Sequence, residues 1–166
     1  LGFFPGSTIG NFEPADARDF LSRARGVLGP GDGFVVGVDL KKDPARLNAA
    51  YNDAAGYTAA FNKNVLVRVR DELGAALTLD QFEHVAFYNE EKSRVEMHLR
   101  SLTEQAFTVG AETFQLAEGE MIHTENSCKY SADDFKALSE ASGFDHVAVW
   151  TDERDYFSIH YLRAPG

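Results

Sequence analysis

The sequence predicts an α/β fold, namely the second half of a doubly wound sheet that ends in an antiparallel hairpin and carries an inserted β-rich domain. An apolar strand, a helix and a second apolar strand open the chain, short extended runs fill its middle, and a helix with two strands closes it. Strands that alternate with helices are typical of parallel sheets, whereas successive short strands are typical of antiparallel ones. We therefore expect three regions: a partial sheet at 1–40, an inserted domain at 41–130, and a final helix and hairpin at 131–166.

The first region reads as strand, helix, strand. Leu1–Phe4 is an apolar run, and Pro14 suits the first turn of the helix that follows. That helix repeats apolar residues at intervals of three and four: Ala17, Phe20, Leu21, Ala24, Val27 and Leu28. Phe34–Val38 is continuously apolar, as in a strand covered on both faces. This order predicts a right-handed crossover between parallel strands.

The middle of the chain changes from helical to extended patterns. Helices are predicted from Pro44 to Asn52 and from Ala54 to Leu73, the second with a row of apolar residues at every fourth position: Phe61, Val65, Val69 and Leu73. Short extended runs follow at Val85–Tyr88, Val95–Leu99, Ala106–Val109, Thr113–Leu116 and Met121–Ser127. We expect them to form an antiparallel sheet over roughly residues 78–130.

The last region begins with a variant of the capping box. Ser131 is followed three residues later by Asp134, which predicts the start of a helix that runs to Gly143. Two strands then follow at Val147–Trp150 and Phe157–Leu162, joined by a charged turn. The hairpin that they form closes the predicted sheet.

Composition excludes several classes of partner. The 166 residues carry a formal charge of -10, and an acidic chain gains nothing from counterion release, so we expect no nucleic acid partner. No apolar run approaches the ~18 residues of a membrane span, so we expect no membrane partner. The single Cys128 cannot form an internal disulfide, which favours a cytoplasmic location.

The apolar stretch at the very start indicates a cut within a buried strand. If strands that precede Leu1 are missing, Leu1–Phe4 would lie at the edge of the remaining sheet. An exposed apolar edge strand pairs readily with other chains. We therefore expect either a longer protein or self-association through the strand near Leu1.

Two loops carry polar groups that suit a small ligand. The segment from Gly6 to Asn11 follows a strand, where ligands bind in open α/β sheets, and its backbone N–H groups and the Asn11 amide could receive a carboxylate. The competing interpretation is a tight turn. In the string from Tyr51 to Asn62, the Tyr51 hydroxyl could face a polar ligand, although the residues alone favour the alternative that Tyr51 packs while Asp53 caps the next helix.

The extended segment from Met121 to Tyr130 suggests a grip on a small ring. Alternation places His123, Glu125 and Ser127 on one face, and two residues along a strand span roughly 6.6 Å. A carboxylate and a hydroxyl at this separation can hold opposite edges of an imidazole, whose two nitrogens donate or accept on opposite sides. The alternative is a half-exposed strand with polar residues in water.

Other chemistry finds less support in the sequence. Met97 alternates with polar neighbours and is predicted to face inward, as core or as pocket lining. The five histidines and Cys128 show no close metal-ligand spacing, so no metal site is predicted. The nucleophile elbow and the phosphate-binding loop are absent, and no catalytic residue is assigned.

Taken together, the segments resemble the histidine-specific methyltransferase family, whose members make trimethylated histidine (hercynine) on the route to ergothioneine. The matching strings, in chain order, are FFPGSTIGN, GVD, AYNDAAGYTAAFN, FEH, VEMHL and TENSCK. They run through nearly the whole chain, and the first and third are the most specific. The family also includes methyltransferases of other amino acids, such as tryptophan derivatives.

The resemblance implies roles for the matched positions. Asn11 and Tyr51, with the Gly6 backbone, would hold the amino and carboxylate end of L-histidine. Met97 would line the side-chain pocket, while Glu125 and Ser127 would hold the imidazole. The implied fold is the second half of a class I methyltransferase sheet with a substrate-binding insertion.

The resemblance implies S-adenosyl-L-methionine as cofactor, but the family's cofactor-binding segments belong to an N-terminal half that is absent here. The cofactor-binding residues therefore stay unassigned. Two alternatives remain open: a methyltransferase of another amino acid such as a tryptophan derivative, and a non-catalytic amino-acid-binding fragment. An apolar residue in place of Glu125 would have favoured the first of them.

Overall fold

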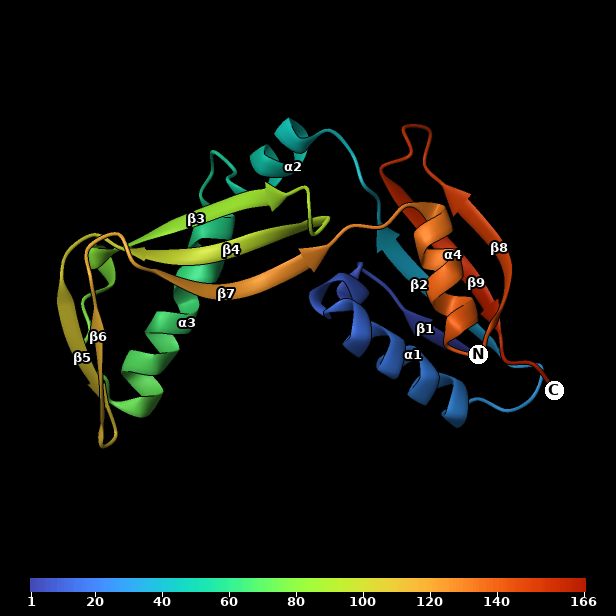
Figure 1. Ribbon diagram of the computed structural model, residues 1–166, viewed down its shortest axis with the longest axis horizontal. Coiled ribbons are helices and arrows are strands. Elements are labelled where there is room, and N and C mark those ends of the chain that lie inside the picture. The colour runs from blue at the N-terminus through green and yellow to red at the C-terminus, as the bar shows by residue number, and fades with distance from the viewer. The chain divides into compact units, whose positions relative to one another are not determined.

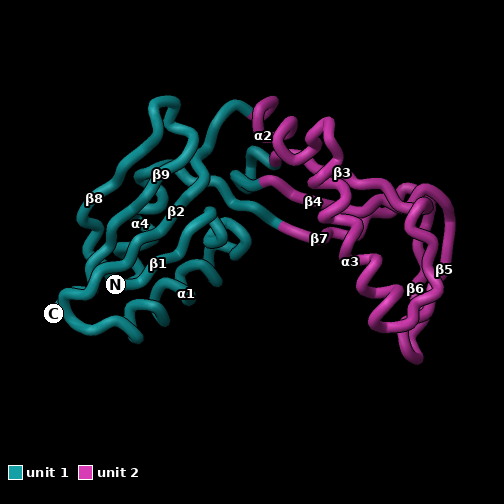
Figure 2. Tube along the Cα trace, turned by 180° about the vertical axis from the view of Figure 1, so that it is seen from behind, with its two compact units in different colours: residues 1–43, 89–94, 126–166 teal, residues 44–88, 95–125 magenta.

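The computed structural model describes residues 1–166, which divide into two compact units (Figure 2). Unit 1 comprises residues 1–43, 89–94 and 126–166, and unit 2 comprises residues 44–88 and 95–125. No helix of the protein combines the length and the apolar character that crossing a membrane requires. Each unit is described in turn.

Unit 1 is built on a four-stranded mixed sheet (Figure 1). Its strand order is β1 (Gly2–Phe4), β2 (Gly33–Asp39), β9 (Phe157–Arg163) and β8 (Asp145–Thr151). β1 and β2 are parallel, while β9 is antiparallel to both of its neighbours. The predicted parallel crossover and the closing antiparallel hairpin are thus confirmed.

The helices of unit 1 begin where their capping signals predict. α1 (Pro14–Val27) has its proline in the first turn, and α4 (Ala132–Ala141) begins with a complete capping box. In that box Asp134 N donates to Ser131 Oγ and Ser131 N donates to Asp134 Oδ2, both at 3.0 Å. These reciprocal bonds satisfy two N–H groups that the start of a helix otherwise leaves without a partner.

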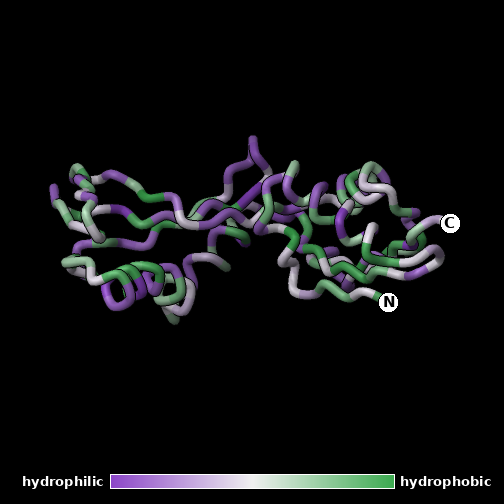
Figure 3. Tube along the Cα trace, turned by 90° about the horizontal axis from the view of Figure 1, so that it is seen from below, coloured by the Kyte–Doolittle hydropathy of each residue, from purple (hydrophilic) through white to green (hydrophobic).

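The core of unit 1 lies between the sheet and its helices. Its buried apolar residues are Ile9, Ala17, Leu21, Phe34, Val36, Val38, Cys128, Tyr130, Phe135, Phe144, Leu162 and Ala164. β1 forms one edge of the sheet, and Leu1 and Phe3 on it are 82% and 70% exposed. Figure 3 shows that the chain is apolar at this N-terminal end. The expected exposed apolar edge is confirmed.

Unit 2 contains two helices and two small sheets (Figure 1). Its helices are α2 (Pro44–Tyr51) and α3 (Tyr57–Leu73). The larger sheet orders β3 (Phe82–Asn89), β4 (Arg94–Ser101) and β7 (Met121–Cys128), and the smaller one pairs β5 (Gln105–Val109) with β6 (Glu112–Leu116).

The prediction of a single inserted sheet is therefore wrong, although the strands lie close to their predicted positions. Ser101 N donates to Glu120 O at 2.9 Å, and Gly119 N donates to Ser101 O at 2.8 Å. These bonds join the end of β4 directly to the segment that precedes β7. Residues 105–116 are consequently left to pair with each other as a separate hairpin.

α3 begins three residues later than predicted because Asp53 caps it. The Asp53 carboxylate accepts from Tyr57 N at 2.9 Å and from Thr58 N at 2.8 Å, and these bonds with Thr58 and Tyr57 lower the pKa of Asp53 to about 2. Gly56 takes a left-handed φ of 76° just before the helix, which favours glycine. The interpretation of Asp53 as a cap is confirmed.

The side of α3 that is buried is not the side that carries its row of apolar residues at every fourth position. Phe61, Val65 and Leu73 are 65%, 45% and 58% exposed, whereas Asn62 and Leu66 are buried. The exposed row lines a cavity of about 810 Å³ that the β5–β6 hairpin borders on another side. A polar residue, Asn62, therefore occupies the core-facing side of the helix.

Candidate substrate-recognition site

The loop after β1 is tied to the end of β2. Gly6 and Ser7 adopt left-handed φ values of 70° and 57°, and Ser7 Oγ accepts from Asp39 N at 2.8 Å. A Cβ placed on Gly37 would approach Gly6 N to 3.4 Å and the Phe157 ring to 2.9 Å. The backbone N–H groups of the predicted ligand loop are therefore held in a fixed position at the carboxyl end of the sheet.

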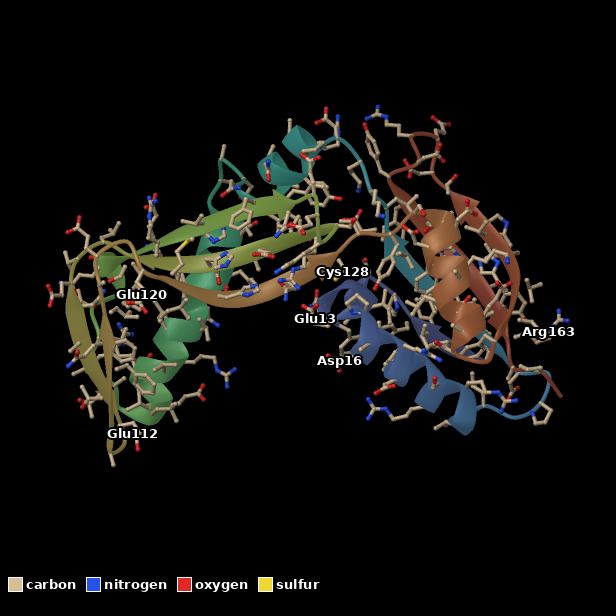
Figure 4. The ribbon with its side chains drawn as sticks, viewed as in Figure 1. Glu13, Asp16, Glu112, Glu120, Cys128 and Arg163 are labelled. Carbon is tan, nitrogen blue, oxygen red and sulfur yellow. The ribbon has the colours of Figure 1, made fainter.

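The same loop packs against the end of β7. A Cβ on Gly10 would lie 2.7 Å from Cys128 O and 3.6 Å from Ser127 Oγ, so no larger residue fits there. The Cys128 thiol, labelled in Figure 4, donates to Phe12 O at 3.4 Å. The structure thus brings Ser127 to the loop that holds Gly6 and Asn11, which the sequence separates by more than one hundred residues.

A buried lysine fixes Ser127. Lys129 Nζ donates to Ser127 Oγ at 2.8 Å and forms an ion pair with Asp39 Oδ2 at 2.8 Å, and only 1% of its side chain is exposed. Because an ammonium only donates, Ser127 Oγ is the acceptor in this bond, and its own proton is directed to another acceptor. Ser127 is thus arranged as a hydroxyl donor. Both Lys129 and Asp39 lie within matched strings, but spacing alone gave no reason to pair them.

Glu13 adds a second link between the loop region and the neighbouring strand ends. Its Oε1 accepts from Arg94 Nη1 at 2.5 Å and from Asn126 Nδ2 at 2.6 Å (Figure 4). The Arg94 side chain is only 11% exposed, whereas 45% of the Glu13 side chain is exposed. These contacts hold Asn126, the residue between Glu125 and Ser127, in place.

In unit 2, Tyr51 and Met97 belong to one apolar cluster. Met97 is 3% exposed and packs with Leu47, Ala86 and Val95, and Tyr51 packs against this group. The inward direction predicted for Met97 is confirmed. The structure therefore places two of the predicted substrate-binding residues, one from α2 and one from β4, in the same apolar cluster.

A buried amide connects four elements of unit 2. Asn62 Nδ2 donates to His84 Nδ1 at 2.9 Å and to His98 O at 3.0 Å. Its Oδ1 accepts from Thr124 Oγ1 at 2.6 Å, and that hydroxyl also lies 2.9 Å from Met97 O. The Asn62 amide thus uses both donors and its acceptor, which fixes its orientation in the core.

The same network reaches Tyr51 through His84. Because His84 Nδ1 accepts from the Asn62 amide, the proton of a neutral imidazole lies on Nε2. Nε2 then donates to Tyr51 O at 2.8 Å. We call Asn62, His84 and Thr124 the unit 2 network, and it bonds directly to the main chain of both Tyr51 and Met97.

Glu125 follows Thr124 on β7. It is half-buried and lines the 810 Å³ cavity, together with His123 and Thr124. That cavity is mainly apolar, and no other predicted substrate-binding residue lines it, so it does not gather the predicted site. Among the six predicted residues, Gly6, Asn11 and Ser127 belong to unit 1. Tyr51, Met97 and Glu125 belong to unit 2.

A cluster that spacing did not indicate also lies in unit 2. Glu96 and His98 of β4 and His123 of β7 bring one ligand atom each to within 4.8 Å of one another. Two strands that are neighbours in the sheet carry them, and the sequence separates His98 from His123 by 25 residues. Only the sheet register reveals this grouping.

Residues 1–164 match the family described as histidine-specific methyltransferase, SAM-dependent. The chain belongs to this family. It is 46% identical to a histidine N-alpha-methyltransferase of Mycolicibacterium smegmatis. The aligned 161 residues cover 96% of this chain and 50% of that protein. The ergothioneine biosynthesis protein 1 of Neurospora crassa is 33% identical over 160 residues, covering 95% of the chain and 18% of the fungal protein.

This family member spans half the length of its bacterial relative. Among solved structures, the CcbJ methyltransferase of Streptomyces caelestis matches with a TM-score of 0.50 and 13% identity, over 98% of this chain and 59% of that one. At this identity the likeness concerns the fold alone. It agrees with a mixed α/β sheet of the methyltransferase type.

The residues present do not by themselves form a site for S-adenosylmethionine, the methyl donor that the family uses. An acidic residue at the end of a strand commonly holds ribose hydroxyls. Asp39, at the end of β2, instead pairs with Lys42 and with Lys129. The loop after β1 is held in place by its contacts with Asp39 N and with Cys128.

Proposed function

We propose that the protein transfers methyl groups from S-adenosylmethionine to the α-amine of L-histidine, giving trimethylhistidine for ergothioneine biosynthesis. This chain would supply the recognition of the amino acid. The proposal is supported by the family membership of the chain and by the name of its bacterial relative. It is carried by one structural observation, the buried Asp39–Lys129–Ser127 arrangement that makes Ser127 a hydroxyl donor two residues after Glu125.

We infer a division of labour within the fold. Unit 1 would form the second half of a class I methyltransferase sheet, with β1 to β2 and the closing hairpin in their usual order. Unit 2 would be the inserted substrate-recognition domain. The regions 1–40 and 131–166 would thus belong to the sheet and 41–130 to the insertion, with the strand ends near 89–94 and 126–130 joining unit 1.

The imidazole would be read by complementary hydrogen bonds. A neutral imidazole has one N–H donor and one acceptor nitrogen. The Glu125 carboxylate would accept from the N–H, while the Ser127 hydroxyl, held by Lys129, would donate to the other nitrogen. An indole has only one N–H and no second ring nitrogen, so it would leave Ser127 without its acceptor. Histidine is therefore favoured over tryptophan derivatives.

The other residues would fix the reacting end of the substrate. Asn11, with the Gly6 backbone and the Tyr51 hydroxyl, would hold the carboxylate and direct the amine toward the methyl donor. The amine must be unprotonated when it attacks, and methyl transfer requires the nucleophile in line with the leaving group, so positioning contributes most of the acceleration. Met97 would limit the depth of the pocket.

The exposed edge of β1 needs a partner in this scheme. We propose that it pairs with further sheet of the same protein, because the bacterial relative is twice as long as this chain. Self-association through the edge near Leu1 is the competing outcome. Light scattering of the full-length protein distinguishes them, since a monomer supports the first arrangement and a dimer that Phe3→Lys dissociates supports the second.

The proposal is tested by calorimetric titration of the full-length protein with L-histidine, with L-tryptophan as control ligand. Glu125→Ala should weaken histidine binding about 5- to 150-fold, because a polar edge of the ring loses its partner at about 1–3 kcal/mol. Glu112→Ala, an exposed change elsewhere in unit 2, should leave the affinity unchanged. Equal affinities for the two variants would refute the assignment of Glu125.

A further inference from the structure

The three side chains Glu96, His98 and His123 lie on one face of the β3–β4–β7 sheet. Glu96 and His98 are two residues apart on β4, so they project from the same side of that strand. His123 lies on β7, the adjacent strand. Ser101 N to Glu120 O and Lys129 N to Ser93 O connect opposite ends of the two strands, which shows that β4 and β7 run antiparallel.

The polar atoms of the three side chains lie close together. One ligand atom from each residue lies within 4.8 Å of the others, and His98 Nε2 is 3.8 Å from Glu96 Oε2. The His98 ring stacks on His123 at 4.5 Å between centroids and on Phe87 at 5.3 Å. Phe87 thus backs His98 on the side away from His123 and limits its movement.

Burial makes this cluster unusual. Glu96 and His98 are only 7% and 8% exposed, whereas His123 is exposed. A bound cation would stabilise a carboxylate that is withdrawn from water in this way. The exposed His123, which stacks on His98, leaves the cluster open to solvent on its side.

The ligand set indicates which ions fit. Two imidazoles and one carboxylate bind zinc in proteins and leave at least one position open. The same set holds other divalent first-row metals, whereas magnesium and calcium prefer oxygen ligands alone. From these observations we propose that Glu96, His98 and His123 form a site for Zn²⁺, with an open coordination position toward solvent.

The site would be linked to β7 and its recognition residue. His123 Nε2 lies 3.2 Å from Glu125 O, so a metal that recruits this nitrogen would remove its contact with the Glu125 main chain. The zinc site itself does not depend on the proposed function. Its test therefore uses metal binding, and failure of histidine binding would leave it unaffected.

The test is a titration of the full-length, metal-stripped protein with Zn²⁺ by calorimetry and with Co²⁺ by visible absorption. We expect one ion per chain and the intense d–d bands of a low-coordinate Co²⁺ site with nitrogen ligands. His123→Gln, at an exposed position, should weaken binding at least about tenfold. Glu96→Gln should do the same while it keeps the size of the side chain.

A second histidine pair provides the matched control. His146 and His160 of unit 1 lie 2.8 Å apart but have no carboxylate in a comparable cluster, so His146→Gln should leave zinc affinity unchanged. Absence of Zn²⁺ binding at micromolar concentration would overturn the proposal. Wild-type affinity in both His123→Gln and Glu96→Gln, or loss of affinity in His146→Gln alone, would overturn it as well.

Discussion

The two units each bury a polar network, but the networks have different neighbours. In unit 1, His160 Nδ1 pairs with His146 Nε2 at 2.8 Å, and His160 Nε2 lies 2.9 Å from Ser158 Oγ, which donates to Val38 O at 3.2 Å. These contacts link β2, β8 and β9 of the sheet. None of them involves a residue to which we assign a role in substrate binding.

The unit 2 network has the same chemistry but bonds to residues of the proposed recognition site. His84 Nε2 donates to Tyr51 O, the Thr124 hydroxyl lies 2.9 Å from Met97 O, and Thr124 immediately precedes Glu125. Burial of a polar group therefore does not by itself define its role. We expect changes in the unit 1 network to alter stability alone, and changes in the unit 2 network to alter both stability and histidine affinity.

The largest effect is expected from Asn62→Leu. The change leaves His84, His98 O and Thr124 without their partner, so the free energy of unfolding should fall by about 3–5 kcal/mol. Histidine affinity should fall as well. Asn64→Leu, the same substitution at an exposed position of α3, serves as control in urea denaturation and calorimetry. Equal unfolding free energies and equal histidine affinities for the two variants would show that the unit 2 network supports neither the fold nor histidine binding.

The next effect concerns pH and the unit 1 network. Burial, and the neighbouring His146, lower the pKa of His160 to about 4. The unfolded chain therefore binds more protons than the native one between pH 6.5 and 4, and stability is lost as the pH falls through this window. The loss from this group is roughly 3 kcal/mol.

His160→Gln tests this prediction, because glutamine can still donate to Ser158 and accept from His146. The pKa of His146 is also lowered by burial, and carboxylates bind protons in the lower part of the same pH range. The slopes of stability against pH of the variant and the wild type are therefore compared, rather than their absolute stabilities. The variant should show the flatter slope with unchanged histidine affinity at pH 7. A slope equal to that of the wild type would contradict the assigned protonation.

A smaller effect is expected at Thr124. Thr124→Val removes the hydroxyl that donates to Asn62 Oδ1, so unfolding free energy should fall by about 1–2 kcal/mol, with a loss of histidine affinity. Thr124→Ser keeps the hydroxyl and should restore affinity. If serine and valine give the same affinity, the hydrogen bond does not contribute to positioning Glu125.

The smallest effect should come from the cap of α4 in unit 1. Ser131→Ala removes one of the two capping bonds and should lower the free energy of unfolding by about 1 kcal/mol. Histidine affinity should stay at the wild-type value. A change in histidine affinity in this variant would contradict the assignment of unit 1 changes to stability alone.

Much of the fold could be predicted from local patterns. The continuous apolar run of β2, the proline start of α1 and the Ser131–Asp134 spacing are each local signals, and each element forms where they indicate. The burial of Met97 also followed from alternation along β4. These predictions succeed because neighbouring residues along the chain determine them.

Apart from the start of α3, which the local cap at Asp53 sets, the features that the sequence did not predict depend on contacts between distant segments. The row at Phe61, Val65 and Leu73 has helical spacing, but spacing does not say which face the core will take, and Asn62 faces the core instead. The split into two inserted sheets depends on how β4 joins β7. The convergence of His98 with His123 and the pairing of Lys129 with Asp39 likewise require the sheet register.

The most direct measurement is a methyl-transfer assay of the full-length protein with S-adenosylmethionine and L-histidine, with the products resolved by mass spectrometry. The account predicts successive mono-, di- and trimethylated histidine, with L-tryptophan left unmethylated at the same concentration. Methylation of tryptophan at an equal rate, or turnover of another amino acid without methylated histidine, would contradict it.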